Sequence, residues 1–237
     1  SFIKPGDKIL HLAACARFAE ADAEPERAWT TNVEGTDCVA RAARKMGAER
    51  VIYASTGSVY MPVKEEPPIT EAFKTWGNSV YGVSKHFGEL AIKRSGIPYI
   101  ILRYGHLYGE GKIGHGLVGG FISRMDRGLS PTLYGGKQSN DMCYIKDIVQ
   151  ANLLALETEK LNEIYNIGTG EELTTTKVFE MLREFFGYQK EFDYLPARPV
   201  DPLHFVYDIS KAKRELGYEP KFSFKQGMEN WYYDRAK

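Results

Sequence analysis

Apolar residues in the first hundred positions follow two alternating patterns. Short runs rich in β-branched and aromatic residues indicate buried strands. Longer segments repeat their apolar positions at helical spacing and stop next to a glycine, which commonly follows a helix. The predicted strands span 8–12, 51–54 and 97–103, and the predicted helices span 25–46 and 79–95. This order indicates an α/β fold with a parallel sheet covered by helices on both faces.

The second half of the chain alternates less regularly and begins with a glycine-rich stretch at 105–120. We expect a strand at 164–167 and a helix that is capped by Thr174 or Thr175 and ends at Phe186. Further helices are expected at 117–127 and 145–157, and the segments 208–216 and 224–235 complete the chain. These elements predict a smaller lobe that closes over the crevice of the sheet.

The composition is that of an ordinary globular protein, with 237 residues, 43% hydrophobic and 26% charged. Lys plus Arg and Asp plus Glu both count 31, so the net charge is zero and gives no electrostatic footprint for nucleic acid or an anionic membrane. No apolar run approaches the ~18 residues of a membrane span. We therefore expect no nucleic-acid partner and no membrane association.

The three cysteines, Cys15, Cys38 and Cys143, are far apart and form no CxxC pair. This pattern predicts neither a disulfide framework nor a structural zinc site. We expect three reduced thiols, no bound metal and a cytoplasmic protein.

Three segments follow the ends of predicted strands, at 11–14, 55–58 and 104–106. Ligands of open parallel sheets bind beyond the carboxyl ends of the strands. We therefore expect these three segments to face one crevice.

Tyr81 and Lys85 form the strongest candidate for chemistry, in the segment Tyr-Gly-Val-Ser-Lys. Residues four apart on a helix share a face, so the phenol and the ammonium can both point into the crevice. A nearby ammonium lowers the pKa of a tyrosine from ~10 toward the range that suits a general base. A hydroxyl of Thr56 or Ser55 is placed to bind the substrate oxygen. The arrangement suits removal of a proton from a sugar hydroxyl, although the spacing alone is also met by solvated pairs.

Seven motifs occur in order along the chain. They are HLAA at 11–14, NVEGT at 32–36, YASTGSVY at 53–60, SVYGVSK at 79–85, LRYGHLYGEG at 102–111, YIKD at 144–147 and YNIG at 165–168. Together they resemble the extended short-chain dehydrogenase/reductases, the NAD-dependent epimerase/dehydratase family of nucleotide-sugar enzymes. The resemblance implies a Rossmann-like parallel sheet with a smaller α/β substrate-binding lobe. It divides the chain into a partial dinucleotide-binding domain at 1–104 and 143–160 and a substrate-binding lobe at 105–142 and 161–237.

The resemblance also implies roles for individual residues. Tyr81 is implied as the catalytic base and acid, Lys85 as the residue that lowers its pKa and holds the nicotinamide ribose, and Thr56 as the catalytic hydroxyl. Further implied contacts with the dinucleotide are Leu12, Ala13, Ala14, Asn32, Ser55 and Tyr104. Implied contacts with the substrate are Thr56, Gly57, His106, Asn140 and Arg198. The implied cofactor is NAD, with NADP open, and the implied substrate is a nucleotide sugar. The implied assembly is a homodimer through the helices at 25–46 and 79–95.

Two departures from the family pattern concern the substrate. His106 stands where the family has asparagine, either as a ligand contact or as a packing residue. Asn140 replaces an arginine that binds the substrate diphosphate in this family, which weakens the assignment of a UDP-sugar as substrate. Arg198 then carries that role, with help expected from Arg103 or Lys137.

A third departure concerns the reaction. Gly57 and Ser58 occupy the places where the dehydratases carry an acidic pair and where a decarboxylase carries glutamate. Both of those reactions are therefore disfavoured. The sequence favours an NAD-dependent nucleotide-sugar epimerase that transfers hydride at a sugar carbon with Tyr81 as base. The alternatives are a reductase or dehydrogenase acting on another carbonyl or sugar substrate, and a non-catalytic relative.

The glycine-rich strand–turn–helix that cradles a dinucleotide pyrophosphate stands well before the HLAA motif in this family. Only ten residues precede that motif here. A literal GEGKIG match at 109–114 is expected to open no β-α-β unit, because the preceding strand is predicted to end at Arg103. We therefore expect an incomplete form that alone binds NAD poorly and is catalytically incompetent.

Overall fold

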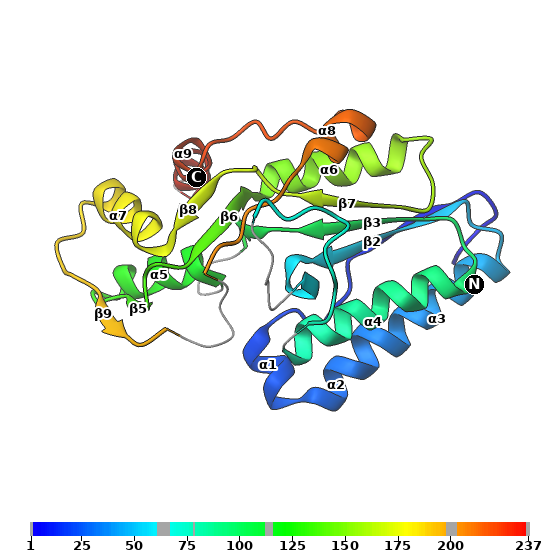
Figure 1. The fold of residues 1–237 in the computed structure, drawn as a ribbon, viewed down its shortest axis with the longest axis horizontal. Helices are drawn as coiled ribbons and strands as arrows, with labels where there is room; N and C mark the ends of the chain where they lie inside the picture. The colour runs from blue at the N-terminus through cyan, green and yellow to red at the C-terminus, as the bar shows by residue number, and fades with distance from the viewer. Residues whose placement is uncertain (1, 61–66, 78, 112–115, 198–202, 236–237) are drawn as a thin grey trace.

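The computed structural model describes residues 2–60, 67–77, 79–111, 116–197 and 203–235. The fold is built on a four-stranded parallel sheet (Figure 1). Its strands lie in the order β1 (Lys8–His11), β2 (Arg50–Thr56), β3 (Tyr99–Tyr104) and β7 (Glu163–Ile167). Thr56 pairs with Tyr104, which pairs with Ile167, so the carboxyl ends of these three strands meet at one edge. The predicted parallel sheet is confirmed.

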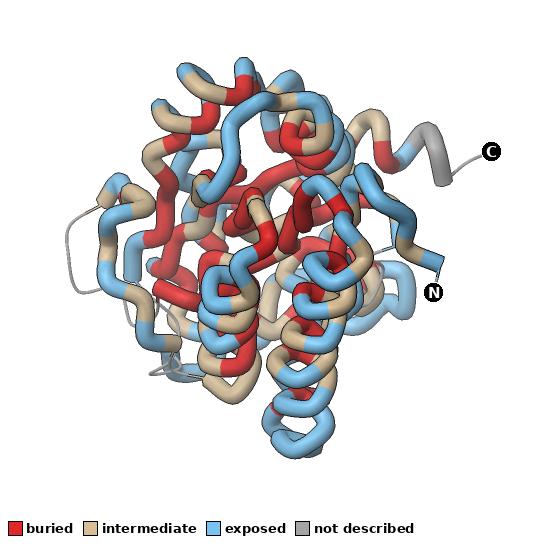
Figure 2. Tube along the Cα trace, turned by 90° about the vertical axis from the view of Figure 1, so that its right-hand side faces the viewer, coloured by how far each residue is buried: buried red, intermediate tan, exposed pale blue. Residues whose placement is uncertain are grey.

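Helices cover both faces of this sheet (Figure 1). Those on one face are α3 (Gly35–Lys45) and α4 (Val80–Ser95), and those on the other are α6 (Ile145–Glu157) and α8 (Ser210–Leu216). Alternate side chains of β2 serve the two faces. Val51 and Tyr53 join the apolar cluster beneath α3 and α4, and Ile52 joins the cluster beneath α6 and α8. Buried residues fill the centre, and the outer surfaces of the helices are exposed (Figure 2).

Helix α4 begins and ends where the sequence predicts. The Ser79 hydroxyl caps its first turn by accepting a hydrogen bond from the Gly82 amide at 3.1 Å. Gly96 ends it with a φ of +74°, a left-handed conformation that favours glycine. Tyr81 therefore lies in the first turn of α4, next to the carboxyl ends of the strands, and Lys85 lies one turn further along.

The helix expected at 25–46 is instead three consecutive segments. They are α2 (Pro25–Trp29), a π-helical turn (Thr30–Glu34) and α3. The wider turn holds Asn32 in the interior. Its Nδ2 donates to the Cys15 carbonyl at 3.0 Å, and its Oδ1 accepts from the Cys15 amide at 2.8 Å. These bonds fix the loop between β1 and α1 (Phe18–Ala23).

The second half forms a smaller lobe with its own core, in which Tyr108, Phe121, Phe179 and Trp231 are buried. Its strands are β4 (His106–Tyr108), β5 (Thr132–Tyr134), β6 (Ser139–Tyr144), β8 (Glu172–Thr174) and β9 (Asp193–Leu195). Its helices are α5 (Gly116–Asp126), α7 (Thr175–Phe186) and α9 (Phe224–Arg235). The sequence predicts α5 and α7 but not the strands, most of which are too short to show alternation.

Two details of the lobe differ from expectation. The division inferred from sequence places 161–237 in the smaller lobe, yet β7 pairs with β3 in the larger sheet and α8 packs on that sheet. The rest of that division stays a prediction. The strand before the glycine-rich match ends at Tyr104 rather than Arg103, and β4 follows it. The GEGKIG match at 109–114 therefore does follow a strand, namely β4. This strand pairs with β6 and is not part of the larger parallel sheet.

Asp141, on β6, joins segments that are far apart in the chain. Its buried carboxylate accepts hydrogen bonds from the Thr169 amide at 2.6 Å, the Thr169 hydroxyl at 2.7 Å, the Gly170 amide at 3.0 Å and the Tyr207 amide at 3.3 Å. Burial raises the pKa of Asp141, and the bonds from Thr169, Gly170 and Tyr207 oppose that shift. The carboxylate thus ties the loop after β7 and the segment around Tyr207 to the smaller lobe.

We predict that Asp141→Ala lowers the free energy of unfolding by about 3 kcal/mol, because buried amides lose their acceptor. The control Asp37→Ala removes an exposed ion pair with Arg41 and should change this free energy by less than about 0.5 kcal/mol. Urea unfolding measures both values. Equal stability of the two variants would show that the Asp141 bonds do not hold these segments together.

Candidate active site

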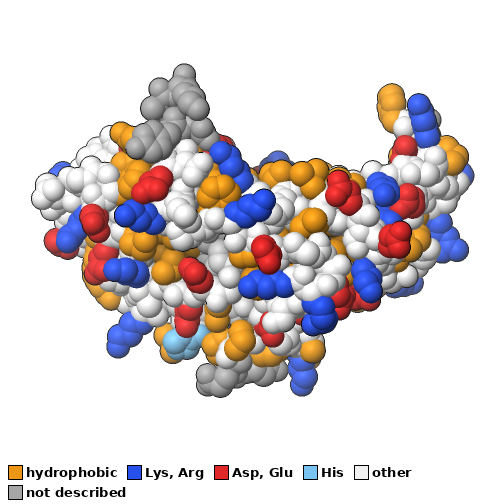
Figure 3. Space-filling view, turned by 90° about the horizontal axis from the view of Figure 1, so that it is seen from above, with side chains coloured by type: hydrophobic (Ala, Val, Ile, Leu, Met, Phe, Trp, Pro, Cys, Tyr) orange, Lys and Arg blue, Asp and Glu red, His pale blue; other side chains and the backbone are white. Residues whose placement is uncertain are grey.

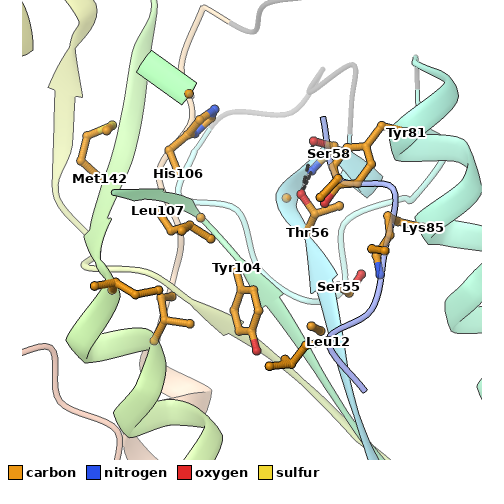
Figure 4. Close-up of a pocket in the computed structure, with 18 of the residues that line it drawn as sticks. Leu12, Ser55, Thr56, Ser58, Tyr81, Lys85, Tyr104, His106, Leu107 and Met142 are labelled. Atoms are coloured by element: carbon orange, nitrogen blue, oxygen red, sulfur yellow. Dashed lines mark hydrogen bonds between the residues drawn. The ribbon is translucent and has the colours of Figure 1, made fainter. Parts of the chain in front are cut away.

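A cavity of about 380 Å³ lies at the carboxyl ends of β1, β2 and β3, beside the smaller lobe (Figure 4). This volume suits a small-molecule site. The segments that follow the three strands all contribute to its wall. Among the described residues of the wall, Lys85 is the only lysine, and there is no arginine, aspartate or glutamate. Hydroxyl groups come from Ser55, Thr56, Ser58, Tyr81 and Tyr104.

Thr56, Ser58 and Tyr81 bring hydroxyl groups to one side of the cavity (Figure 4). The Thr56 hydroxyl donates to Ser58 Oγ at 3.3 Å and accepts from the Ser58 amide at 3.2 Å, which holds its orientation. Tyr81 is half-buried. The ring of Phe18, on α1, stands edge-on to the Tyr81 ring with 5.2 Å between centroids. The phenol is thus shielded on one side and accessible from the cavity.

Burial raises the pKa of Tyr81 to about 12, and a hydrogen bond with the Thr56 side chain opposes the shift. The sequence predicts the opposite direction, with Lys85 lowering this pKa. In this structure desolvation outweighs the hydrogen bond and sets the direction of the Tyr81 shift. The lowering of this pKa by Lys85 stays a prediction for the site with substrate and cofactor bound. The Lys85 ammonium is directed at another ring, that of Tyr53.

Lys85 is 2% exposed and lies between α4 and the sheet. Its Nζ atom stands over the ring of Tyr53, 4.0 Å from the centroid. Burial lowers the pKa of Lys85 to about 7, and the Glu89 carboxylate one turn along α4 opposes the shift. The protonation of this amine is therefore balanced near neutral pH.

A buried ion pair lies behind the cavity wall. Arg103 Nε and Nη2 donate to the two carboxylate oxygens of Glu89 at 2.9 and 2.7 Å. The Ser55 hydroxyl donates to the same carboxylate at 2.6 Å, and Arg103 also donates to the Tyr60 hydroxyl at 2.7 Å. Arg103 is 2% exposed and is not part of the wall. The prediction that it helps to bind a diphosphate is therefore wrong.

Gly57 and Phe205 meet at one end of the cavity. A Cβ atom on Gly57 would lie 2.3 Å from Cζ of Phe205 and 2.6 Å from the Tyr207 hydroxyl. Phe205 is buried, and its ring stands edge-on to His106 with 5.6 Å between centroids. Position 57 therefore has no room for an acidic side chain. Packing against Phe205 requires glycine here, in addition to the lack of an acidic group compared with the dehydratases.

The structure brings most of the predicted site residues to this cavity. Those in its wall are Leu12, Ala14, Ser55, Thr56, Gly57, Tyr81, Lys85, Tyr104 and His106. Ala13, Asn32 and Asn140 are not in the wall. Asn32 clamps the loop around Cys15, and Asn140 Nδ2 lies 3.5 Å from Thr175 Oγ1. Lys137 is exposed and also outside the wall, and Arg198 lies outside the described residues.

Sequence reasoning missed the wall opposite the tyrosine, where Leu107 and Met142 lie (Figure 4), and it also missed Phe205. These residues belong to short strands or irregular segments and carry no local signal. The ion pair between Arg103 and Glu89 could have been predicted from the sequence. Arg103 ends an apolar run, and a buried charge needs a partner. Glu89 follows Lys85 by four residues on the face of α4 that turns to the sheet.

Other features of the described residues bear on possible partners. They include no group of three or more His, Cys, Asp or Glu side chains that could hold a metal ion. None of the described helices combines the length and the apolar character needed to cross a membrane. Cys15 and Cys143 are buried, Cys38 is exposed, and all three are free. Acidic and basic side chains are interspersed on the face shown in Figure 3.

Comparison with known proteins finds relatives over nearly the whole chain. The model of the NAD dependent epimerase/dehydratase family matches residues 2–168. A UDP-glucose 4-epimerase of Thermotoga maritima, solved with UDP-glucose, is 34% identical with a TM-score of 0.90, over 98% of this chain and 78% of its own. A UDP-glucuronic acid 4-epimerase of Bacillus cereus, solved with UDP-glucuronic acid and NAD, is 29% identical with a TM-score of 0.87, over 98% and 76%. UDP-glucuronic acid decarboxylase 6 of Arabidopsis thaliana is 32% identical over 94% of this chain and 67% of its own.

Gly57→Ala is expected to lower the free energy of unfolding by about 1–3 kcal/mol, because the added methyl group overlaps the Phe205 ring. Gly120→Ala is the matched control, because a Cβ at position 120 of α5 would meet no atom within 4 Å. It should be neutral or stabilising, since alanine favours a helix. Thermal and urea unfolding compare the two. Gly57→Ala as stable as Gly120→Ala would show that Phe205 does not restrict position 57.

Proposed function

Because the chain belongs to the NAD-dependent epimerase/dehydratase family, we propose that it is an NAD-dependent nucleotide-sugar epimerase with Tyr81 as its base. The observation that carries the proposal is the placement of Thr56, Tyr81 and Lys85 around one cavity. Reversible oxidation of a sugar hydroxyl needs three groups. A hydroxyl holds the substrate oxygen, a phenol exchanges the proton of that oxygen, and an ammonium acts on the phenol and the cofactor ribose.

The part of the wall nearest β1 and β2 suits the nicotinamide half of NAD. Leu12 and Ala14 offer an apolar surface for a ring, and Ser55 and Lys85 offer polar groups for an amide and a ribose. We propose that these four residues, with Tyr104, hold this half of the cofactor. NAD, when bound, accepts a hydride from a sugar carbon and can return it.

Tyr81 is proposed to take the proton from a sugar hydroxyl as the hydride leaves the same carbon, and to give it back when the hydride returns to the other face. A phenol with a pKa of about 12 is a poor base at neutral pH. The proposal therefore requires the charge of Lys85 to act on the phenol during the reaction. The Thr56 hydroxyl, held by Ser58, keeps the substrate oxygen beside the phenol.

Dehydration and decarboxylation have less support than epimerisation. In this family these reactions use an acidic side chain next to the catalytic hydroxyl, and Phe205 leaves no space for one at Gly57. A reductase acting on another carbonyl substrate is the second candidate. It is favoured by Asn140, which removes a positive charge from the place where the family has an arginine.

A homodimer is proposed through the outer side of α4 and the helical turns before α3. Trp29 and Phe87 are both exposed, and their rings lie 5.1 Å apart between centroids. Leu90, nearly one turn further along α4, is exposed as well. A second copy would remove this apolar patch from water. We also propose a cytoplasmic location, which the three free cysteines support.

Tyr81→Phe is expected to reduce turnover by at least about 100-fold, because it removes the proton-exchanging group and keeps the ring. NAD affinity should stay within about 2-fold. Because this chain alone is expected to bind NAD poorly, both values are measured on the full-length protein. Turnover is measured on a panel of UDP-, dTDP-, GDP- and CDP-sugars, and affinity by NADH fluorescence. The control Tyr99→Phe, at the other end of β3, should change neither value.

Two outcomes would contradict this assignment. Undiminished turnover by Tyr81→Phe would remove Tyr81 as the base. Turnover of a simple carbonyl substrate with no activity on the whole sugar panel would favour the reductase.

Phe87→Glu is expected to produce monomers, because it places a charge in the apolar patch that the proposed partner covers. Leu161→Glu places the same charge at another exposed leucine, just before β7, and should leave a dimer. Size-exclusion chromatography with light scattering measures the mass of each. A wild-type protein that is monomeric at high concentration would rule out the dimer.

A further inference from the structure

The ammonium of Lys85 lies in a place that penalises charge. Lys85 is 2% exposed, and its charged group is directed at the sheet beneath α4. Among the described residues, no hydrogen bond or close ion pair joins this ammonium to another side chain. The direct contact that the structure gives it is the ring of Tyr53, at 4.0 Å from Nζ to the centroid.

The ring of Tyr53 is held in place from several sides. Tyr53 is 0% exposed on β2, and its side chain points to the same face of the sheet as Ser55. Its hydroxyl lies against Gly88 of α4, where a Cβ atom would approach it to 2.1 Å. The ring of His11, on β1, lies 5.7 Å away between centroids. Such a ring cannot turn its face away from Lys85 without moving α4.

The other titratable groups around Lys85 do not replace this contact. Burial lowers the pKa of His11 to about 4, and Lys85 adds to that shift, so the imidazole is neutral at pH 7. Glu89 lies one turn along α4, but its carboxylate is bound by Arg103 and Ser55. Burial raises the pKa of Tyr81, which is therefore neutral as well. The long-range attraction of Glu89 and the face of the Tyr53 ring remain to stabilise the charge.

We propose that Tyr53 is a positioning residue, whose ring face keeps the Lys85 side chain charged and in place for its action on Tyr81 and the cofactor ribose. The face of an aromatic ring carries negative charge density and attracts a cation, more so where water is excluded. The proposal rests on the proposed function, because that function gives Lys85 its role. It adds a residue outside the cavity wall that acts through Lys85.

A double-mutant cycle tests the proposal on the whole protein. Tyr53→Leu removes the ring face, Lys85→Met removes the cation, and the third variant combines them. Tyr53→Leu should lower turnover by roughly 3- to 30-fold, the range of a desolvated cation–π contact. The same substitution should have no further effect in the Lys85→Met background, because the partner is already absent.

Tyr53→Phe is the conservative variant of the set. It keeps the ring face and removes a buried hydroxyl, whose neighbour is the Thr36 side chain. It should therefore retain most of the turnover that Tyr53→Leu loses. Urea unfolding of all variants separates loss of stability from loss of turnover.

The outcomes of the cycle are distinguishable. Equal losses caused by Tyr53→Leu in both backgrounds would make the ring a packing residue and overturn this proposal alone. The same conclusion follows if Tyr53→Leu keeps full turnover while Lys85→Met does not. Full turnover by Lys85→Met would overturn both this proposal and the role of Lys85 in the proposed function.

A second series covers the case in which Tyr53→Leu does not fold. Phenylalanine with one, two or three ring fluorines at position 53 nearly conserves shape while it withdraws charge from the ring face. Turnover should fall stepwise with each fluorine when Lys85 is present and stay constant in the Lys85→Met background. A flat response with Lys85 present would overturn the proposal.

Discussion

A buried ammonium imposes the main constraint on this site. Lys85 sits between α4 and the sheet, where burial works against its charge. The neighbouring side chains counter this penalty at different ranges. Glu89 supplies a negative charge one turn along the same helix, and Arg103 pairs with Glu89 so that this carboxylate can itself stay charged while buried. Tyr53 supplies the direct contact. The polar layer behind the cavity therefore supports the one charged side chain of its described wall.

Packing at the opposite end of the cavity limits which reaction the site can run. Asp141 ties the segment around Tyr207 to the smaller lobe, and the same segment brings Phe205 against Gly57. An acidic side chain next to Thr56 would need that aromatic ring to move. The proposed preference for epimerisation therefore rests on a residue far away in sequence as well as on the local motif at 56–58.

Local signals were enough for much of the fold and for most of the residues that line the cavity. Continuous apolar runs indicate the strands of the parallel sheet, Ser79 and Gly96 mark the ends of α4, and the carboxyl ends of the strands bring Thr56 and Tyr81 together. The direction of the Tyr81 pKa shift was not predictable in the same way. It depends on how deeply the phenol is buried and on where Lys85 points, and both result from tertiary packing. The walls built from short strands were missed for the same reason.

In the proposed reaction a sugar carbon is oxidised by NAD and then reduced again within one site. The most direct measurement uses a nucleotide sugar that the protein turns over, labelled with deuterium at the carbon that inverts, and follows the product by NMR and mass spectrometry. We predict an inverted sugar that keeps its deuterium on the same carbon, without net consumption of NAD. An inverted sugar that has lost the label to solvent, or turnover that consumes NADH in step with product, would contradict it.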